Sequence, residues 1–198
     1  VDGLLDIARI EAGRISLNIG EIHTVALLDQ IEAMFAPQAR AKGLEFGIER
    51  VGRIPEIVRG DEQRLRQILI NLVGNAIRFT RTGLVRLRIA YAWEVATFEV
   101  IDTGPGIAED KLEQIFLPFE RLDADLSGLT SGTGLGLTIC QLLTQFMGGE
   151  LAVKAAEGGG THFTLRLFLA RRKKAVADAN AEAGQAATGY RGPRRHIL

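Results

Sequence analysis

Apolar residues recur at intervals of three and four in three long stretches, a spacing that places them on one face of a helix. These stretches predict three main helices, at residues 25–41, 62–78 and 135–147. Asp61 precedes the second stretch and is a good N-cap, whereas Pro37 is expected to bend or interrupt the first helix. A shorter helix is expected at residues 109–116.

Other stretches alternate between apolar and polar residues, which is the two-residue period of a strand packed on a core through one face. They predict strands at residues 14–19, 44–51, 84–92, 95–101, 150–155 and 161–169. Helices and strands follow one another in mixed order along the chain. We therefore expect an α+β fold, a two-layer α/β sandwich in which a mixed sheet packs against three helices.

The composition is that of a globular domain with further segments at its ends. The chain has 198 residues, of which 46% are hydrophobic, so it can build a core. Although 24 basic residues balance 24 acidic ones, residues 171–198 have a net charge of +5 and the rest of the chain −5. A negatively charged body is a poor match for a nucleic-acid backbone, so we predict no nucleic-acid partner.

The chain shows no sign of a membrane segment or of disulfides. Its apolar runs are much shorter than the roughly 18–20 residues that cross a bilayer. No basic segment followed by an apolar stretch opens the chain, so we expect no signal peptide and no direct membrane contact. The single cysteine, Cys140, lies among apolar residues and is expected to be a core thiol. We expect a cytoplasmic location for this chain; an anchor of the parent protein in the inner membrane is compatible with that.

Three motifs carry candidate chemistry. In the first, Asn71 and Asn75 are four residues apart and share a helix face, with Arg78 one turn further on. Two amides and a cation on one face suit a magnesium ion and a phosphate chain. A polar helix face that bonds a loop is the alternative for this motif.

The other two motifs are rich in glycine. Asp102 ends an apolar strand and is followed by Gly104 and Gly106, so a flat ligand could approach the backbone while the carboxylate accepts from an exocyclic amine. Residues 131–137 open a helix with alternating glycines, which exposes backbone amides where the helix dipole favours an anion. Ordinary turn chemistry is the alternative for the first motif and a flexible hinge for the second.

The order of these motifs resembles the nucleotide-binding catalytic domain of sensor histidine kinases, within the wider GHKL family of gyrase-type, Hsp90-type and MutL-type ATPases. The resemblance covers about residues 1–170 and implies the Bergerat ATP-binding fold. The matching segments are the N box (71–80), first glycine box (102–107), F box (115–121), second glycine box (131–137) and last glycine turn (157–163).

The resemblance implies that ATP and Mg²⁺ bind here. Asn75 would ligate the Mg²⁺, with Asn71 beside it, and Arg78 would hold phosphate where the family usually has lysine. Phe79 would stack beside adenine, and Asp102 would accept a hydrogen bond from the adenine amine.

The remaining implied contacts come from the glycine boxes and the F box. Thr161 would support the Asp102 contact through water, and Arg121 would reach the γ-phosphate. The first glycine box contributes Gly104, Gly106 and Ile107 to the nucleotide site. The second would surround the phosphates through residues Gly132, Thr133, Gly134, Leu135, Gly136 and Leu137. The catalytic candidates are thus Asn71, Asn75, Arg78 and Arg121.

One position separates a kinase from an ATPase. In the hydrolysing relatives the residue one turn before the metal-binding Asn is a glutamate that can activate water. Here it is Asn71, and an amide does not accept that proton at neutral pH. The resemblance therefore favours transfer of the γ-phosphoryl group to a protein histidine over hydrolysis. A nucleotide-binding regulatory module and a GHKL-type ATPase are the alternatives.

The resemblance also predicts the domain order and the partners. Residues 1–13 would end the second dimerisation helix, 14–170 form the catalytic domain, 171–193 a linker and 194–198 the start of a receiver domain. The phosphoacceptor histidine would lie on a dimerisation domain outside this chain, so we expect Mg-ATP binding without self-phosphorylation. The expected partners are that dimerisation domain and a response regulator or fused receiver, in a protein that is a hybrid kinase.

Overall fold

The structure is a computed structural model that describes residues 16–120, 134–156 and 158–172. The helices of this part are α2 (Thr24–Ala41), α3 (Glu62–Phe79) and α4 (Gly136–Phe146). Two short 3₁₀ turns are η1 (Glu109–Lys111) and η2 (Gln114–Phe116). The strands are β1 (Gly20–His23), β2 (Glu45–Val51), β3 (Ile57–Gly60), β4 (Leu84–Ala92), β5 (Val95–Asp102), β6 (Glu150–Ala155) and β7 (Thr161–Phe168).

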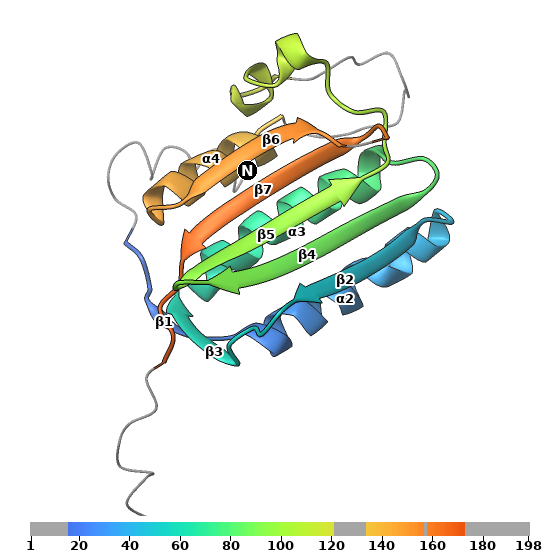
Figure 1. Cartoon of the computed structure of the whole chain (residues 1–198). Helices are drawn as coiled ribbons and strands as arrows, with labels where there is room; N and C mark the ends of the chain where they lie inside the picture. Colours follow the sequence, from blue (N-terminus) through green and yellow to red (C-terminus); the bar gives the residue numbers. More distant parts are fainter. Residues whose placement is uncertain (1–15, 121–133, 157, 173–198) are drawn as a thin grey trace, which may run out of the picture.

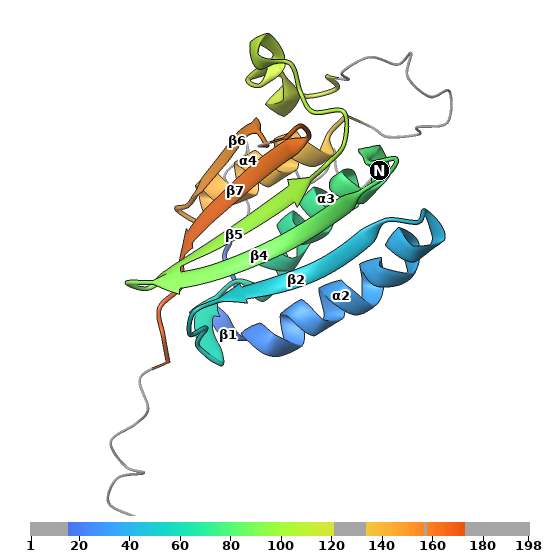
Figure 2. The same cartoon turned by 45° about the vertical axis from the view of Figure 1, so that its right-hand side comes forward.

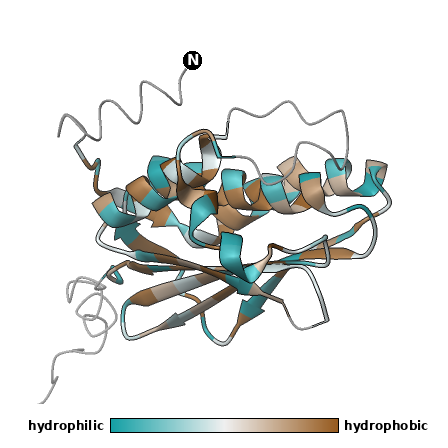
Figure 3. Ribbon diagram, turned by 90° about the horizontal axis from the view of Figure 1, so that it is seen from above, coloured by the Kyte–Doolittle hydropathy of each residue, from teal (hydrophilic) through white to brown (hydrophobic). Residues whose placement is uncertain are grey.

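Five strands form one sheet in the order β2-β4-β5-β7-β6. The pairing of β2 with β4 is parallel and the other three pairings are antiparallel, so the sheet is mixed. The three helices cover one face of this sheet (Figures 1 and 2), and the view from above separates a helix layer from a sheet layer (Figure 3). The expected two-layer α/β sandwich is confirmed.

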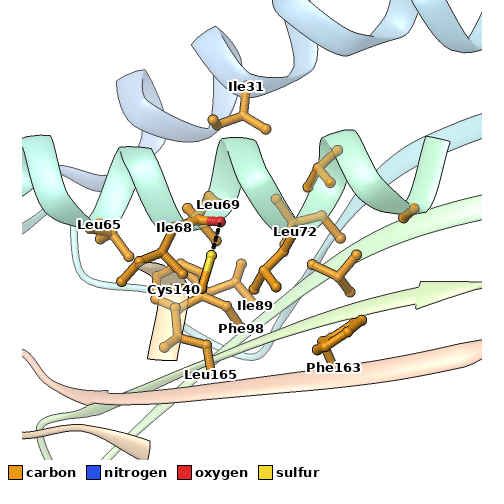
Figure 4. Packing of buried hydrophobic residues seen from close by; sticks show 14 of the residues in the cluster. Ile31, Leu65, Ile68, Leu69, Leu72, Ile89, Phe98, Cys140, Phe163 and Leu165 are labelled. Atoms are coloured by element: carbon orange, nitrogen blue, oxygen red, sulfur yellow. Dashed lines mark hydrogen bonds between the residues drawn. The ribbon is translucent and has the colours of Figure 1, made fainter. Parts of the chain in front are cut away.

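Helix α3 forms the middle of the helix layer and supplies much of the core. Its apolar residues are buried between α2 and the sheet (Figure 4): Leu65, Ile68, Leu69, Leu72, Val73 and Ile77. Cys140 of α4 is fully buried beside them, and its Sγ donates to the Ile68 carbonyl oxygen at 3.8 Å. Each large apolar side chain buried in this way contributes about 1.5–3 kcal/mol, so burial of this face holds α3 against the sheet.

Asp61 connects the start of α3 to the segment that precedes β1. Its Oδ1 accepts from the backbone N–H of Arg64 at 3.0 Å, which confirms the predicted N-cap. Its Oδ2 accepts from the backbone N–H of Asn18 at 2.9 Å. One buried carboxylate therefore holds both the incoming chain and the first turn of α3.

The structure differs from the sequence predictions in four elements. A strand was expected at residues 14–19, but the described residues 16–19 are not in a strand and β1 begins at Gly20. The pairing partner of β1, β3, was not predicted. The helix expected at 109–116 consists of η1 and η2, because so short a segment with Ile115 as its one buried residue gains too little to nucleate an α-helix. Pro37 does not interrupt α2. Proline has no N–H, so the carbonyl of Ala33 loses its helical donor, but both residues are exposed to solvent.

The turn between β4 and β5 lies where it was expected, at Trp93 and Glu94. Both residues have positive φ, 53° and 63°, and Trp93 is 95% exposed. At the end of β7, Arg171 forms a bridge with Val58, and Arg172 pairs with Glu21 at 3.3 Å.

Several predictions concern residues outside the described part of the chain. These are the dimerisation-helix remnant at 1–13, the linker from residue 173 onward and the receiver start at 194–198. Among the described residues, no helix is long and apolar enough to cross a membrane.

Candidate functional site

Four segments meet at one end of the sandwich: the end of β5, the turn into β7, the C-terminal half of α3 and the start of α4. Asp102 is the last residue of β5, and Thr161 is the first residue of the neighbouring strand β7. Asp102 Oδ1 accepts from the backbone N–H of Gly104 at 2.8 Å and from that of Thr161 at 3.3 Å. The strand pairing thus brings together two predicted site residues that are 59 positions apart.

Burial raises the pKa of the Asp102 carboxyl above its ordinary value. The backbone N–H groups of Gly104 and Thr161, and the Thr161 side chain, act in the opposite direction by hydrogen bonding. Asp102 is 5% exposed and Thr161 7%. A carboxylate desolvated in this way strongly favours a ligand that brings its own N–H donor, as the amine of a purine does.

Glycines allow the backbone to close tightly around Asp102. A Cβ on Gly160, whose φ is +94°, would lie 1.9 Å from the Asp102 carbonyl oxygen. A Cβ on Gly104 would lie 2.7 Å from Asp102 Oδ1 and 3.3 Å from Thr80 Oγ1. A side chain at position 160 would displace the backbone of Asp102, and one at position 104 would displace its carboxylate or Thr80. The packing around Asp102 therefore requires glycine in both turns.

The end of α3 forms a second side of the site. Arg78 and Phe79 occupy its last two positions, and the Arg78 guanidinium lies over the Phe79 ring, 5.2 Å from its centroid. Phe79 is 48% exposed, which leaves ring surface available for stacking. Asn75, one turn earlier, is half-buried.

The side chain of Asn71 contacts two residues of α4. Its Oδ1 lies 3.5 Å from the position of a Cβ on Gly136, the first residue of α4. Its side chain also hydrogen-bonds Cys140, although burial dominates and raises the pKa of that thiol to about 12. Asn71 therefore links α3 to the start of α4, a contact that sequence spacing did not predict.

The start of α4 has polar groups that could bind a ligand. Leu135, the N-cap residue, offers no side-chain acceptor to the first backbone N–H groups of the helix. The hydroxyl of Thr138, in the first turn, is buried and has no hydrogen-bond partner among the residues that the structure describes. Gly134, with φ +69°, accepts from the backbone N–H of Phe119 at 3.2 Å. These groups fit an anion at the N-terminus of α4.

Most of the predicted site residues lie on these four segments. Leu135 is buried in the core, and Ile107, in the loop after β5, and Leu137 pack against the core. Arg121, Gly132 and Thr133 lie outside the described residues. Sequence reasoning missed three contributors: Thr80, Thr138 and Gly160. Thr80 and Gly160 lie inside motifs that had been recognised, whereas nothing in the sequence marks the hydroxyl of Thr138 as unpaired.

Residues 60–171 match the family of histidine kinase-, DNA gyrase B- and HSP90-like ATPases. The sensory/regulatory protein RpfC of Xanthomonas campestris is 37% identical over 176 residues, which are 86% of this chain and 24% of RpfC. A crystal structure of full-length ShkA in complex with AMPPNP has a TM-score of 0.77 and 34% identity, over 87% of this chain and 36% of ShkA. The catalytic domain of histidine kinase ThkA has a TM-score of 0.65 and 29% identity, over 76% of this chain and 97% of that domain.

A mixed five-stranded sheet under three helices, with glycine turns around a buried aspartate, defines a nucleotide-binding α/β sandwich of the GHKL type. The chain belongs to the family of histidine kinase-, DNA gyrase B- and HSP90-like ATPases. Within that family it is an ATP-binding domain of the sensor histidine kinase type. It spans about a quarter of the length of the curated relative RpfC.

Proposed function

We propose that this domain binds Mg-ATP and transfers the γ-phosphoryl group to a histidine of a protein partner. The observation that carries the proposal is the buried Asp102 carboxylate, which is held by Gly104 and Thr161 at the edge of the α3 segment bearing Asn75. Its remaining acceptor capacity suits the exocyclic amine of adenine. Phe79, the last residue of α3, offers a partly exposed ring that would stack on the base.

The phosphate end of the nucleotide would lie between α3 and the start of α4. The first backbone N–H groups of α4 and the hydroxyl of Thr138 would donate to phosphate oxygens, and Arg78 would add a positive charge. Asn75, with Asn71 beside it, would hold Mg²⁺ through its amide oxygen. The bound ion would neutralise charge on the triphosphate.

The absence of a carboxylate at position 71 supports transfer over hydrolysis. An amide there is a poor base for water, and its contacts with Gly136 and Cys140 give it a structural role. In the transfer, the bond between the γ-phosphorus and the bridging oxygen of ADP breaks. A bond to an imidazole nitrogen of the acceptor forms, so positioning and charge neutralisation account for most of the catalysis.

The rest of the signalling chain follows from the family. The acceptor histidine would belong to the protein's own dimerisation domain, and an aspartate of a response regulator or fused receiver would take the phosphoryl group next. Both would lie in the parts of the protein that this chain does not include. A cytoplasmic location of the domain, in a parent that is free or anchored in the inner membrane, completes the proposal.

A calorimetric titration with a non-hydrolysable ATP analogue, with Mg²⁺ and with chelator, tests the proposal. We expect Mg²⁺-dependent binding that Asn75→Ala weakens, while Gln63→Ala, which removes an exposed amide from the same helix, leaves it unchanged. Loss of the Mg²⁺ effect in the wild type, or equal affinity of both variants, would contradict the assignment of Asn75. Steady phosphate release by the domain alone would favour an ATPase, and binding without transfer to a supplied dimerisation domain would favour a regulatory module.

A further inference from the structure

Lys42 lies at the end of α2 and directs its side chain to the end of α3. Its ammonium group donates three hydrogen bonds to backbone carbonyl oxygens: to Ile77 at 2.7 Å, to Arg78 at 2.9 Å and to Thr80 at 3.0 Å. An ammonium group has three N–H bonds, so all of its donors are used at this one place. The contact joins residues 35 to 38 positions apart.

These carbonyls are the groups that a helix end leaves without partners. The Ala76 carbonyl oxygen of α3 already accepts from the N–H and the hydroxyl of Thr80, at 3.0 and 2.7 Å. Lys42 supplies donors for the next two carbonyls and for the first one beyond the helix. Its positive charge also lies at the negative end of the helix dipole, where a cation is favoured.

The backbone around Lys42 is itself held in place. Its N–H bonds the carbonyls of Gln38 and Ala39, and the chain then turns at Gly43, whose φ is +70°. The N–H of Leu44 returns to the Ala39 carbonyl at 2.9 Å. The side chain therefore starts from a backbone that several hydrogen bonds hold in place, and its three hydrogen bonds tie the end of α3 to that point.

The carbonyls that Lys42 binds belong to the segment that forms the adenine side of the site. Arg78 precedes Phe79, the ring expected to stack on the base, and Thr80 packs against Gly104, which donates to Asp102. A shift at the end of α3 would therefore move the stacking ring relative to the carboxylate.

We propose that Lys42 is a positioning residue for nucleotide binding, which fixes the last turn of α3 so that Phe79 and Asp102 face the same base. This inference rests on the proposed function of the site. Lys42 touches neither the expected ligand nor the metal, and it acts through the backbone of residues 77–80.

A purely structural role makes a different prediction. Loss of a helix cap lowers stability at either end of α3, but only the C-terminal end carries Phe79 and Arg78. Asp61→Ala removes the cap at the other end of the same helix and serves as the matched control. Arg40→Met, at an exposed position in the last turn of α2, controls for loss of a positive charge.

The experiment measures the dissociation constant of a Mg²⁺-bound, non-hydrolysable ATP analogue at a temperature where circular dichroism shows every variant folded. We expect Lys42→Met to raise the constant about tenfold, a size typical of residues that act through an intervening element. Asp61→Ala should lower the melting temperature and, like Arg40→Met, change the constant by less than about twofold. Lys42→Arg, which keeps donors for the same carbonyls, should recover most of the affinity.

Wild-type affinity in a folded Lys42→Met, or in Lys42→Gln should the methionine variant not fold, would overturn the inference. An equal loss of affinity in Lys42→Met and Asp61→Ala would also overturn it, since the effect would then follow stability. If the wild type binds and Asp102→Asn does not, the proposed function stands whatever Lys42 does. A wild type that does not bind the analogue overturns the proposed function and this inference with it.

Discussion

Replacing Asp102 by asparagine is expected to stabilise the fold and weaken nucleotide binding at the same time. The two side chains have the same shape, so an amide oxygen can keep the bonds from the Gly104 and Thr161 N–H groups. The substitution removes a buried negative charge whose desolvation raises the pKa of Asp102. At neutral pH the free energy of unfolding should therefore stay equal or rise.

The loss of affinity can be estimated from the bond that the ligand would lose. A hydrogen bond to a charged group contributes about 1.5–3 kcal/mol, which corresponds to about a 10- to 150-fold rise in the dissociation constant. The amide nitrogen of asparagine would also present a donor where the adenine amine brings one. We therefore expect affinity to fall by at least about tenfold.

The pH dependence follows from the raised pKa of Asp102. In the wild type the folded state favours the protonated form of Asp102. The stability that this protonated carboxyl contributes is therefore present at low pH and is lost as pH rises through the folded-state pKa. The stability difference between wild type and Asp102→Asn should thus be largest near neutral pH and shrink on acidification. Affinity for the nucleotide should fall on acidification, beginning above the ordinary aspartate range, as the acceptor becomes protonated.

Urea unfolding between pH 4 and 8 and titration with the non-hydrolysable ATP analogue measure both effects. A variant that binds as tightly as the wild type would refute the role of Asp102 in base recognition. A variant that unfolds much more easily would refute the claim that the buried charge, and not a structural bond, dominates the energetics at this position.

Three further predictions concern stability and reactivity. Asp61→Ala should lower the free energy of unfolding by about 1–3 kcal/mol, because the N-cap of α3 and the bond to Asn18 are both lost; urea denaturation measures this. Cys140, with its pKa near 12, should react with iodoacetamide at pH 8 at least about a hundredfold more slowly in the folded protein than in urea, as followed by mass spectrometry. Combining Trp93→Asn with Glu94→Gly should raise the free energy of unfolding by about 0.5–1 kcal/mol, since both positions have positive φ; an unchanged or lower thermal midpoint would count against the strain at this turn.

Most of the fold was predictable because its periodic segments are long. The stripe of α3 and the alternation of β4 and β5 run for eight residues or more, and their observed bounds differ from the predicted ones by one residue at most. Strand β3 was missed because four residues after Pro55 carry almost no periodicity, and its pairing with β1 depends on contacts some 40 positions away.

The contacts within the candidate site were predictable where they join neighbouring residues. The motif around Asp102 and Gly104 carries its own hydrogen bond, so the sequence was enough to single it out. Two contacts between distant segments were not predicted: the ammonium of Lys42 on the end of α3, and the amide of Asn71 against Gly136. A helix pattern shows which face is polar but does not show which neighbouring element that face meets.

Asp61 accepts two hydrogen bonds at the N-terminal end of α3, one from the first turn of the helix and one from Asn18. A helix of 18 residues is about 27 Å long, so this carboxylate lies about that far from Arg78 and Phe79, the residues expected to face the nucleotide. A displacement of the chain at Asn18 would therefore reach α3 at the end remote from the candidate site. The hydrogen bonds around Asp102 would not be part of that contact.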